Sequence, residues 1–316
     1  MQAAIMNLMD NTASLETKIK RHEDNLKFLN SQANHLDESI LDLQVSLARY
    51  HSDVSKADNV YGAYHSEEET VAQILQKENS AASILCSAES HDFSQTTKSA
   101  LTKDVVGVVA TLAWVDNDNL SRTLSEFLGL ETMLAIVSRT SEGAKALESY
   151  DGEGIISCTD GLHGFGSLIG RKINGRFLVI CLDELRQYVG GLVADDPQKR
   201  LAISKPKLPN GEDPPGFLGY AVNLINLDTR NLHFITANGH GLRETLFYSL
   251  FSCLQVYRSR KEMLLALPCI TDGALSLDGG MIKDSGVFVL GSRKNVEVKF
   301  AVTSGSPDCT CKLHSN

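Results

Sequence analysis

Apolar residues recur at alternating steps of four and three near the start of the chain, with no proline or glycine between residues 15 and 47. A narrow stripe of this period is typical of a coiled-coil helix, which we expect over residues 1–50. The alternative, an amphipathic helix lying on a globular core, would show a wider apolar face. The predicted seam is Leu15, Ile19, His22, Leu26, Leu29, Ala33, Leu36, Ile40, Leu43 and Leu47.

Residues 51–101 read as a linker and a second helix. The first part, 51–65, has no period, and Ser66 with Glu69 fits a capping box that would open the helix. From Thr102 the pattern changes to alternating strands and helices. We expect strands at 105–115, 132–138 and 176–182, and helices at 117–129, ending on Gly129, and at 141–150, with Ser141 as N-cap.

The same order recurs after a stiff segment, 204–216, that holds four prolines. A strand at 217–227 is followed by a helix or helix-to-strand segment at 246–257 and a helix at 259–267. A strand that runs into a turn at 269–280 and two late strands, "SGVFVLGS" and "NVEVKFAV", come next. The predicted fold is an α/β (α+β) domain of two pseudo-repeated halves, 102–203 and 217–303, before a disordered tail, 304–316.

Composition narrows the function classes. The formal net charge of −9 gives no general attraction to DNA, although Lys199, Arg200, Lys205 and Lys207 form one local basic cluster and Arg258, Arg260 and Lys261 another. The longest apolar run is too short to span a membrane, and no signal peptide is visible. The seven cysteines are scattered and fit a reducing interior, with no zinc-ligand spacing, so we expect no metal.

The stretch "TDGLHGFGSLIGRKINGR" (159–176) is the main candidate for chemistry. It lacks the Lys-Ser/Thr end of a P-loop, and its Gly-x-Gly-x-x-x-Gly spacing is one residue too long for a dinucleotide fingerprint. Ser167 is not flanked as a nucleophile elbow requires. We therefore expect no catalytic residue and no cofactor. Gly161, Gly164, Gly166 and Gly170 would instead shape a loop or short helix, a partner-docking insert on the surface.

Three segments carry a family resemblance: "DVVGVVATLAWVDNDNL", "NGRFLVICLDEL" and "GALSLDGGMIKDSGVFVLGS". They resemble the opening strand, the Gly-Arg strand and the closing signature of the hinge domain of structural maintenance of chromosomes (SMC) proteins. "KIKRHEDNLKFLNSQ" and "GLRETLFYSLFSCLQVYRSR" extend the likeness, from about residue 15 to 300, to a plant hinge protein of RNA-directed DNA methylation. Leu290 stands where the family has a closing glycine, and the tail lacks the second helical arm, which implies a C-terminally shortened form.

The resemblance implies a non-catalytic nuclear scaffold in gene silencing. Its expected partners are a second copy of itself, an SNF2-type chromatin remodeller, a small methylation accessory protein and, indirectly, RNA polymerase V. Gly279, Gly280, Gly286 and Gly291 either form tight turns or let strand edges of two protomers meet. Two other functions stay open: a nucleic-acid-binding hinge with weak DNA contact, and an enzyme that uses the glycine stretch.

Overall fold

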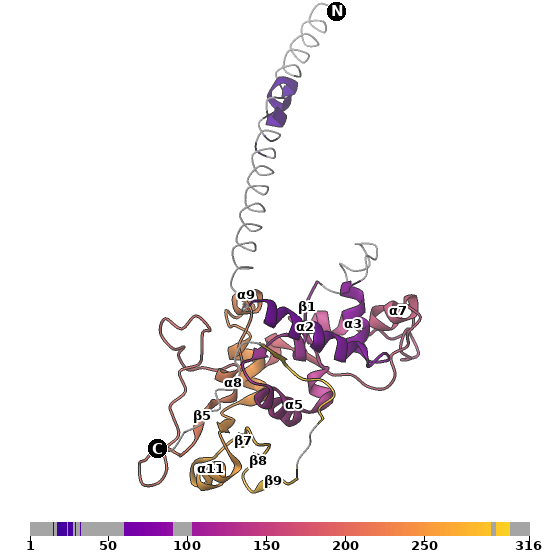
Figure 1. Ribbon diagram of the computed structural model, residues 1–316. Coiled ribbons are helices and arrows are strands. Elements are labelled where there is room, and N and C mark those ends of the chain that lie inside the picture. The colour runs from indigo at the N-terminus through magenta and orange to yellow at the C-terminus, as the bar shows by residue number, and fades with distance from the viewer. Residues whose placement is uncertain are drawn as a thin grey trace, which may run out of the picture. The chain divides into compact units, whose positions relative to one another are not determined.

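The computed structural model describes residues 15, 18–23, 25–27, 29, 32, 60–90, 103–291 and 295–303 (Figure 1). The chain separates into two units, Met1–Val60 and Tyr61–Asn316. In the first unit the described positions are helical, and the seam residues Leu15, Ile19, His22, Leu26 and Leu29 are exposed. Ala33, Leu36, Ile40, Leu43 and Leu47 lie outside the described residues, so the coiled coil stays a prediction.

Two helices open the second unit instead of one. Helix α2 (Val60–Leu75) already runs through Ser66, so the predicted N-cap at that residue is wrong. Helix α3 (Ala81–Ser90) follows a break, and the Ser80 hydroxyl accepts the backbone N–H of Ser83 at 3.1 Å. The pair buries Ile74, Ile84 and Leu85 in the core. The break exists because Ser80 satisfies a first-turn amide of α3, which ends the continuous helix.

The first sheet has the order β1-β3-β4, with β1 (Val105–Val108) antiparallel and β4 (Val179–Cys181) parallel to β3 (Ile136–Ser138). The single strand predicted over 105–115 is wrong. A 3₁₀ turn, η1 (Val109–Thr111), separates β1 from a second short strand, β2 (Trp114–Val115). The Thr111 hydroxyl donates to the Val108 carbonyl at 2.9 Å and stabilises this turn.

Three α-helices connect these strands, and a 3₁₀ turn follows β4. The Asn117 side chain caps α5 (Asp118–Met133). Gly129, with φ 78° and ψ 159°, is non-helical and separates two helical segments at a kink, so the first segment ends at Gly129 as predicted and a second continues to Met133. Helix α6 (Ser141–Ala146) is shorter than predicted, and its N-cap is Thr140, whose hydroxyl accepts from Gly143 N–H at 3.0 Å. Helix α7 (Gly161–Leu168) and the 3₁₀ turn η2 (Leu182–Glu184) complete this half.

The second sheet has the order β5-β6-β7-β8-β9. Its strands are β5 (Phe217–Tyr220), β6 (Gln255–Tyr257), β7 (Ala274–Ser276), β8 (Met281–Asp284) and β9 (Val287–Val289). Only β6 and β7 run parallel. The predicted helix-to-strand change within 246–257 is confirmed, whereas β8 was not predicted as a strand of its own.

Short helices connect β5, β6 and β7 along the chain. They are α8 (Ala221–Leu224), α9 (Thr229–His233), the π-helix η3 (Arg243–Phe247), α10 (Tyr248–Phe251), α11 (Arg260–Leu265) and the 3₁₀ turn η4 (Leu267–Cys269). The strand predicted over 217–227 therefore divides into β5 and α8. Both sheets begin with an antiparallel pair that bulges at a glycine, Gly107 or Gly219, followed by a parallel strand. They differ in strand number, and the pseudo-repeat stays a prediction.

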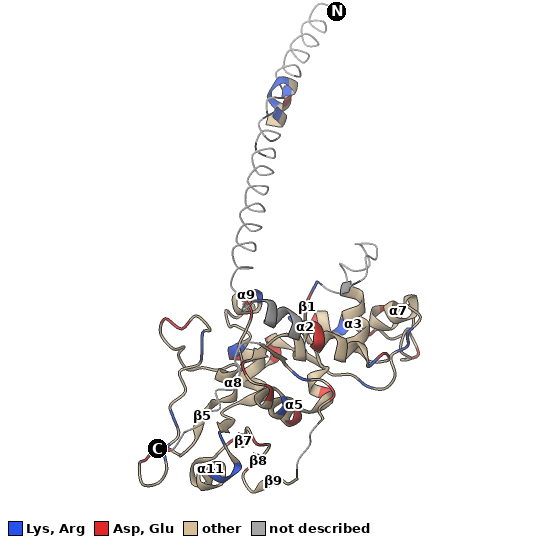
Figure 2. Ribbon diagram, viewed as in Figure 1, with Lys and Arg blue, Asp and Glu red and all other residues tan. Residues whose placement is uncertain are grey.

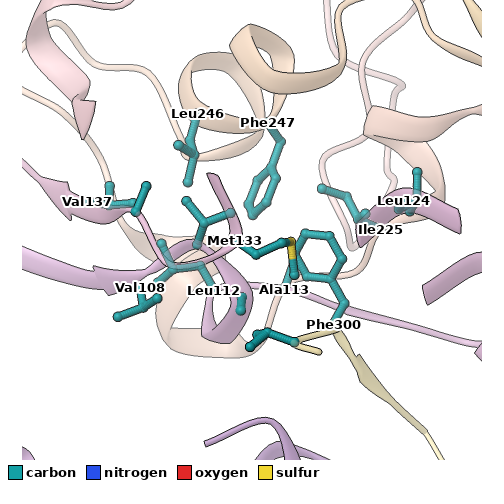
Figure 3. Packing of buried hydrophobic residues seen from close by; sticks show 14 of the residues in the cluster. Val108, Leu112, Ala113, Leu124, Met133, Val137, Ile225, Leu246, Phe247 and Phe300 are labelled. Carbon is teal, nitrogen blue, oxygen red and sulfur yellow. The ribbon is translucent and has the colours of Figure 1, made fainter. Parts of the chain in front are cut away.

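One core joins the two halves. Leu124 and Met133 of the first half pack in the same cluster as Ile225 and Phe247 of the second (Figure 3). Burial of these side chains in a shared cluster couples the stability of the halves, since neither keeps a complete core without the other.

The last described segment, 295–303, is fixed between α2 and α5. The Thr70 hydroxyl donates to Lys299 O at 3.1 Å, and the Gln73 side-chain oxygen accepts Lys299 N–H at 3.1 Å. The Ser121 hydroxyl donates to Phe300 O at 2.6 Å. Strand β10 (Ala301–Val302) then pairs in parallel with β2. Helix α2, the first helix of this unit, is thus hydrogen-bonded to segment 295–303, its last described segment.

Candidate hinge interface

Strand β9 carries apolar side chains at an open sheet edge. Val287, Phe288 and Val289 are 50, 45 and 37% exposed, and the following Leu290 is 86% exposed. The strand pairs with β8 on one side and ends the sheet on the other. An edge strand with unpaired backbone groups and apolar side chains is a template for pairing with another strand. This edge is therefore the first candidate interface.

The glycines predicted near this edge lie in its turns. Gly279 (φ 88°) follows β7, Gly286 (φ 77°) lies between β8 and β9, and Gly291 (φ 96°) follows β9. These left-handed conformations favour glycine. A Cβ on Gly280 would come within 2.5 Å of the Ser276 hydroxyl oxygen. A positive φ supports the tight-turn alternative at Gly279, Gly286 and Gly291, whereas close packing explains the glycine at 280. The contact of these glycines with a second protomer stays a prediction.

Arg260 at the start of α11 holds both ends of this hairpin region. Its guanidinium donates to Gly279 O and to Gly291 O, each at 3.2 Å. The Asp278 carboxylate accepts the Arg260 backbone N–H at 2.9 Å. Desolvation raises the pKa of Asp278. Hydrogen bonds from Ser276 and Arg260 and the Arg260 charge lower it by a larger amount, so the pKa of Asp278 lies below its usual value. From the sequence, Arg260 was identified only as part of a basic cluster. Its acceptors are the backbone carbonyls of Gly279 and Gly291, which any residue type would supply, so no sequence pattern reveals these bonds.

A groove of about 630 Å³ lies beside β4, the end strand of the first sheet. The Glu148 carboxylate lies 3.1 Å from the His163 imidazole and also accepts from the Tyr150 hydroxyl. The Ser167 hydroxyl donates to backbone carbonyls, including His163 O at 2.9 Å. Ser167 and His163 are thus not arranged as nucleophile and base. The groove is lined by Ala144, Lys145, Glu148, Tyr150, Ile156, Gly175, Arg176, Phe177 and Val179.

The glycine-rich stretch forms a helix, α7, which confirms the expectation of a loop or short helix. It packs against α3: Leu162 and Phe165 are buried, and a Cβ on Gly166 would lie 3.0 Å from Ile84 Cδ1. After the helix, the Arg171 guanidinium donates to the hydroxyls of Ser83 and Ser87 at 3.2 and 3.1 Å. Gly166 therefore allows close packing against α3, while the docking of a partner on this insert stays a prediction.

Gly164→Ala should lower the free energy of unfolding by about 2 kcal/mol, since overpacking against backbone cannot relax by rotamer change. The added Cβ would meet Thr159 O at 2.2 Å. Urea denaturation followed by circular dichroism measures the loss. Gly152→Ala is the matched control, because nothing lies within 4 Å of its Cβ position. Equal stability of the two variants would contradict the close approach of Gly164 to the Thr159 backbone.

The first basic cluster is largely bonded within the chain. The Arg200 guanidinium donates to Asp196 Oδ1 at 2.9 Å and to Asn226 Oδ1 at 3.2 Å. Lys199 Nζ donates to Leu232 O at 3.2 Å, and Lys207 forms an ion pair with Asp213 at 2.5 Å. Side chains that already have partners offer less to phosphate groups. These internal bonds make residues 199–207 a weaker candidate for DNA contact.

The Asp196 carboxylate accepts hydrogen bonds from Gln198 and Arg200 in the same loop, and its side chain is 11% exposed. Desolvation raises its pKa, but hydrogen bonds from the backbone N–H groups of Arg200 and Gln198 and the Arg200 charge outweigh it, so the pKa is lowered. A lowered folded-state pKa contributes stability above the unfolded value that is lost as pH falls through the folded pKa.

Asp196→Asn should therefore destabilise the protein most at neutral pH. Its stability should approach that of the parent as pH falls below about 4, the ordinary range of an aspartate pKa. Urea denaturation of both proteins across that pH range is the measurement. Asp195→Asn, at the neighbouring exposed carboxylate, is the control. A stability difference that is constant with pH would rule out the charged form as its source.

Within the described residues, no group of three or more His, Cys, Asp or Glu side chains is arranged to hold a metal ion. The helices of that part of the chain include none with the length and apolar character needed to cross a membrane.

In sequence the chain is similar to the class of SMC hinge domain-containing proteins. The chain is 36% identical over 311 residues to the structural maintenance of chromosomes flexible hinge domain-containing protein GMI1 of Arabidopsis thaliana. That alignment covers 96% of this chain and 18% of the relative, so the chain spans about a fifth of the curated relative's length. The match confirms the resemblance to the SMC hinge family. No family model matches the chain.

Solved hinge domains give weaker likenesses. An asymmetric dimer of the Geobacillus stearothermophilus SMC hinge domain has a TM-score of 0.38 at 16% identity, covering 79% of this chain and 84% of that one. The Pyrococcus furiosus SMC hinge domain has a TM-score of 0.35 at 14% identity, covering 75% and 98%. At these scores the structural likeness adds nothing to the sequence match.

Proposed function

We propose that the chain is a non-catalytic scaffold that dimerises through open strand edges and bridges silencing factors on chromatin. The observation that carries the proposal is the exposed apolar edge at β9 in a chain similar to a hinge-domain protein. Apolar edge strands are stabilised by pairing, which here joins two copies. Strand pairing at this edge would be a binding function, and it requires no catalytic side chain.

We infer that β9 of one copy pairs with β4 of the other. Each copy has one of each edge, so a two-fold axis would form the contact twice and leave both edges covered. The groove beside β4, with Phe177 and Val179 in its lining, offers an apolar seat for side chains of the incoming strand. An isologous pairing of this kind closes at two copies and does not propagate.

The partners follow from the sequence resemblance. We propose an SNF2-type remodeller, a small RNA-directed DNA methylation accessory protein and, indirectly, RNA polymerase V, in the nucleus. The helical entry at α2, hydrogen-bonded to segment 295–303, would give such a scaffold a fixed base for its arms.

Light scattering on the full chain at micromolar concentration tests the dimer. A strict monomer that also fails to retain purified remodeller in a pull-down would reject the scaffold. The alternative, a nucleic-acid-binding hinge, rests on the exposed Lys261 and on Arg258, whose side chain is 72% exposed although it lies 4.0 Å from the Glu262 carboxylate. DNA affinity measured across a salt series tests it, because each phosphate contact steepens the salt dependence. No measurable affinity at low salt would reject this alternative.

A further inference from the structure

Helix α11 turns leucines toward solvent. Leu264 and Leu265 are 44 and 58% exposed, and Leu267, in the following 3₁₀ turn, is 40% exposed. Lys261 is exposed one turn before Leu264 and Leu265. Residues 261, 264 and 265 share one side of a helix because of its 3.6-residue period. We call Lys261, Leu264, Leu265 and Leu267 the α11 face.

The opposite side of α11 already anchors the helix. Met263 and Ala266 are buried in a cluster with Tyr257 and Ile282. Burial of those two side chains accounts for the attachment of α11 to the sheet, and the leucines of the α11 face take no part in that cluster. Single exposed leucines are ordinary, but three gathered on α11 and the 3₁₀ turn that follows it form a patch of the kind found at interaction sites.

Cationic side chains outnumber carboxylates near the α11 face, with Arg258, Arg260 and Lys261 against Glu262 and Asp278, and part of α11 is basic (Figure 2). Lys261 is exposed on the face itself. The Arg258 side chain is 72% exposed and lies 4.0 Å from the Glu262 carboxylate. Glu262 also accepts from the Ser259 hydroxyl at 2.9 Å, and Asp278 accepts from Arg260 N–H. The carboxylates keep their charge, so the excess beside the leucines is one positive charge, on a chain whose formal net charge is −9.

Leucines beside positive charge fit one kind of partner. We propose that the α11 face binds an acidic amphipathic helix of another protein, with apolar side chains on Leu264 and Leu265 and carboxylates toward Lys261 and Arg258. A second copy of this face would oppose like charges across a two-fold contact. Duplex DNA would use the charges but leave the leucines exposed. A helix of six residues is too small for a membrane anchor.

This inference goes beyond the proposed function and does not rest on it. The α11 face is on a different element from β9, although Arg260 of the same helix binds Gly291 O. Loss of dimerisation and loss of helix binding are therefore separate outcomes.

The test uses the full chain with methyl-labelled leucine and two synthetic helical peptides of about 18 residues. Both peptides carry leucines at i, i+3, i+4 and i+7, and one has glutamate where the other has lysine. We expect the acidic peptide to shift the methyl signals of Leu264 and Leu265 and to bind about tenfold or more tightly than the basic one. In the double variant Leu264→Ser/Leu265→Ser its affinity should fall about tenfold or more.

Two variants keep the test decisive. Lys261→Glu should reduce the preference for the acidic peptide without loss of the fold, since Lys261 is exposed. Leu168→Ser, at a leucine 67% exposed on α7, should leave affinity unchanged. Equal binding of both peptides, binding unaffected by the double variant, or no binding at all would overturn the proposal. A lower oligomeric mass of the double variant would also overturn it and assign the face to a second copy.

Discussion

Replacing Arg243 with leucine should lower the free energy of unfolding by about 3 kcal/mol. Arg243 is 2% exposed in the π-helix η3. Its guanidinium donates to the backbone and side-chain oxygens of Gln198, each at 3.1 Å, and to Ile225 O at 3.0 Å. It also donates to Val222 O. Leucine would leave these oxygens without this donor, at about 1–3 kcal/mol for each acceptor that stays buried and unsatisfied.

The charge of Arg243 is retained at neutral pH. Burial, followed by the nearby Arg200 charge, lowers the pKa of Arg243 to about 10. A base whose folded-state pKa is depressed adds pH dependence only above that folded value, where the folded state releases its proton first. The stability difference between Arg243→Leu and the parent should therefore be the same at about pH 6 and about pH 8, in contrast to that of Asp196→Asn.

Urea denaturation followed by circular dichroism is the measurement for Arg243→Leu. Arg243→Lys keeps the charge but not the planar fork of donors, so an intermediate loss is expected. Arg186→Leu, at an exposed arginine, is the control and should change stability by less than about 0.5 kcal/mol. A loss below about 1 kcal/mol in Arg243→Leu would show that the loop at Gln198 is not held by this side chain.

The order of strands and helices was readable from the sequence because buried strands and amphipathic helices have different apolar periods. The boundaries were not. The run 105–115 is apolar throughout, and nothing in its period reveals that Thr111 bonds to Val108 O and divides it. Gly129 ends the first segment of α5 as predicted, but nothing in the pattern showed that a second segment continues to Met133 after the kink. Such boundaries depend on single side-chain to backbone bonds, which apolar patterns do not encode.

The position of the candidate interface could be predicted from the sequence, but the exposure of its apolar side chains could not. "VFVL" at 287–290 has the composition of a buried strand, and its exposure follows from its place at the end of the sheet order. Sheet order is a long-range property, so local sequence does not give it. Arg243 was missed for a similar reason. Its acceptors come from residues 198, 222 and 225, and carbonyl oxygens carry no sequence signal.

Replacing Val287 with lysine should convert the proposed dimer to a monomer at micromolar concentration. Val287 is 50% exposed on the edge strand β9, and a charge placed within a strand pairing is one of the devices that keep natural sheet edges apart. In a two-fold dimer the substitution occurs at both contacts, so its effect is doubled. A loss of about 1.4 kcal/mol at each contact would weaken dimerisation about a hundredfold.

The measurement is sedimentation equilibrium over a concentration series, which gives the association constant of parent and variant. Val189→Lys is the matched control, since it makes the same substitution at a valine that is 93% exposed and outside the strands. The thermal transitions of both variants should match that of the parent monomer, because neither side chain is part of the core. Equal dimerisation of Val287→Lys and Val189→Lys would exclude β9 as the interface.

A further substitution separates the two proposed edges. Val179 belongs to β4 and lines the groove beside it. If β9 of one copy pairs with β4 of the other, Val179→Lys should weaken dimerisation as Val287→Lys does, and the double variant should lose little more, because both changes affect the same contact. Full additivity of the two effects would instead indicate separate contacts, with β9 meeting an edge other than β4. A hinge that closes through unlike edges forms a discrete dimer, whereas an edge that paired only with itself would leave β4 open to a further copy.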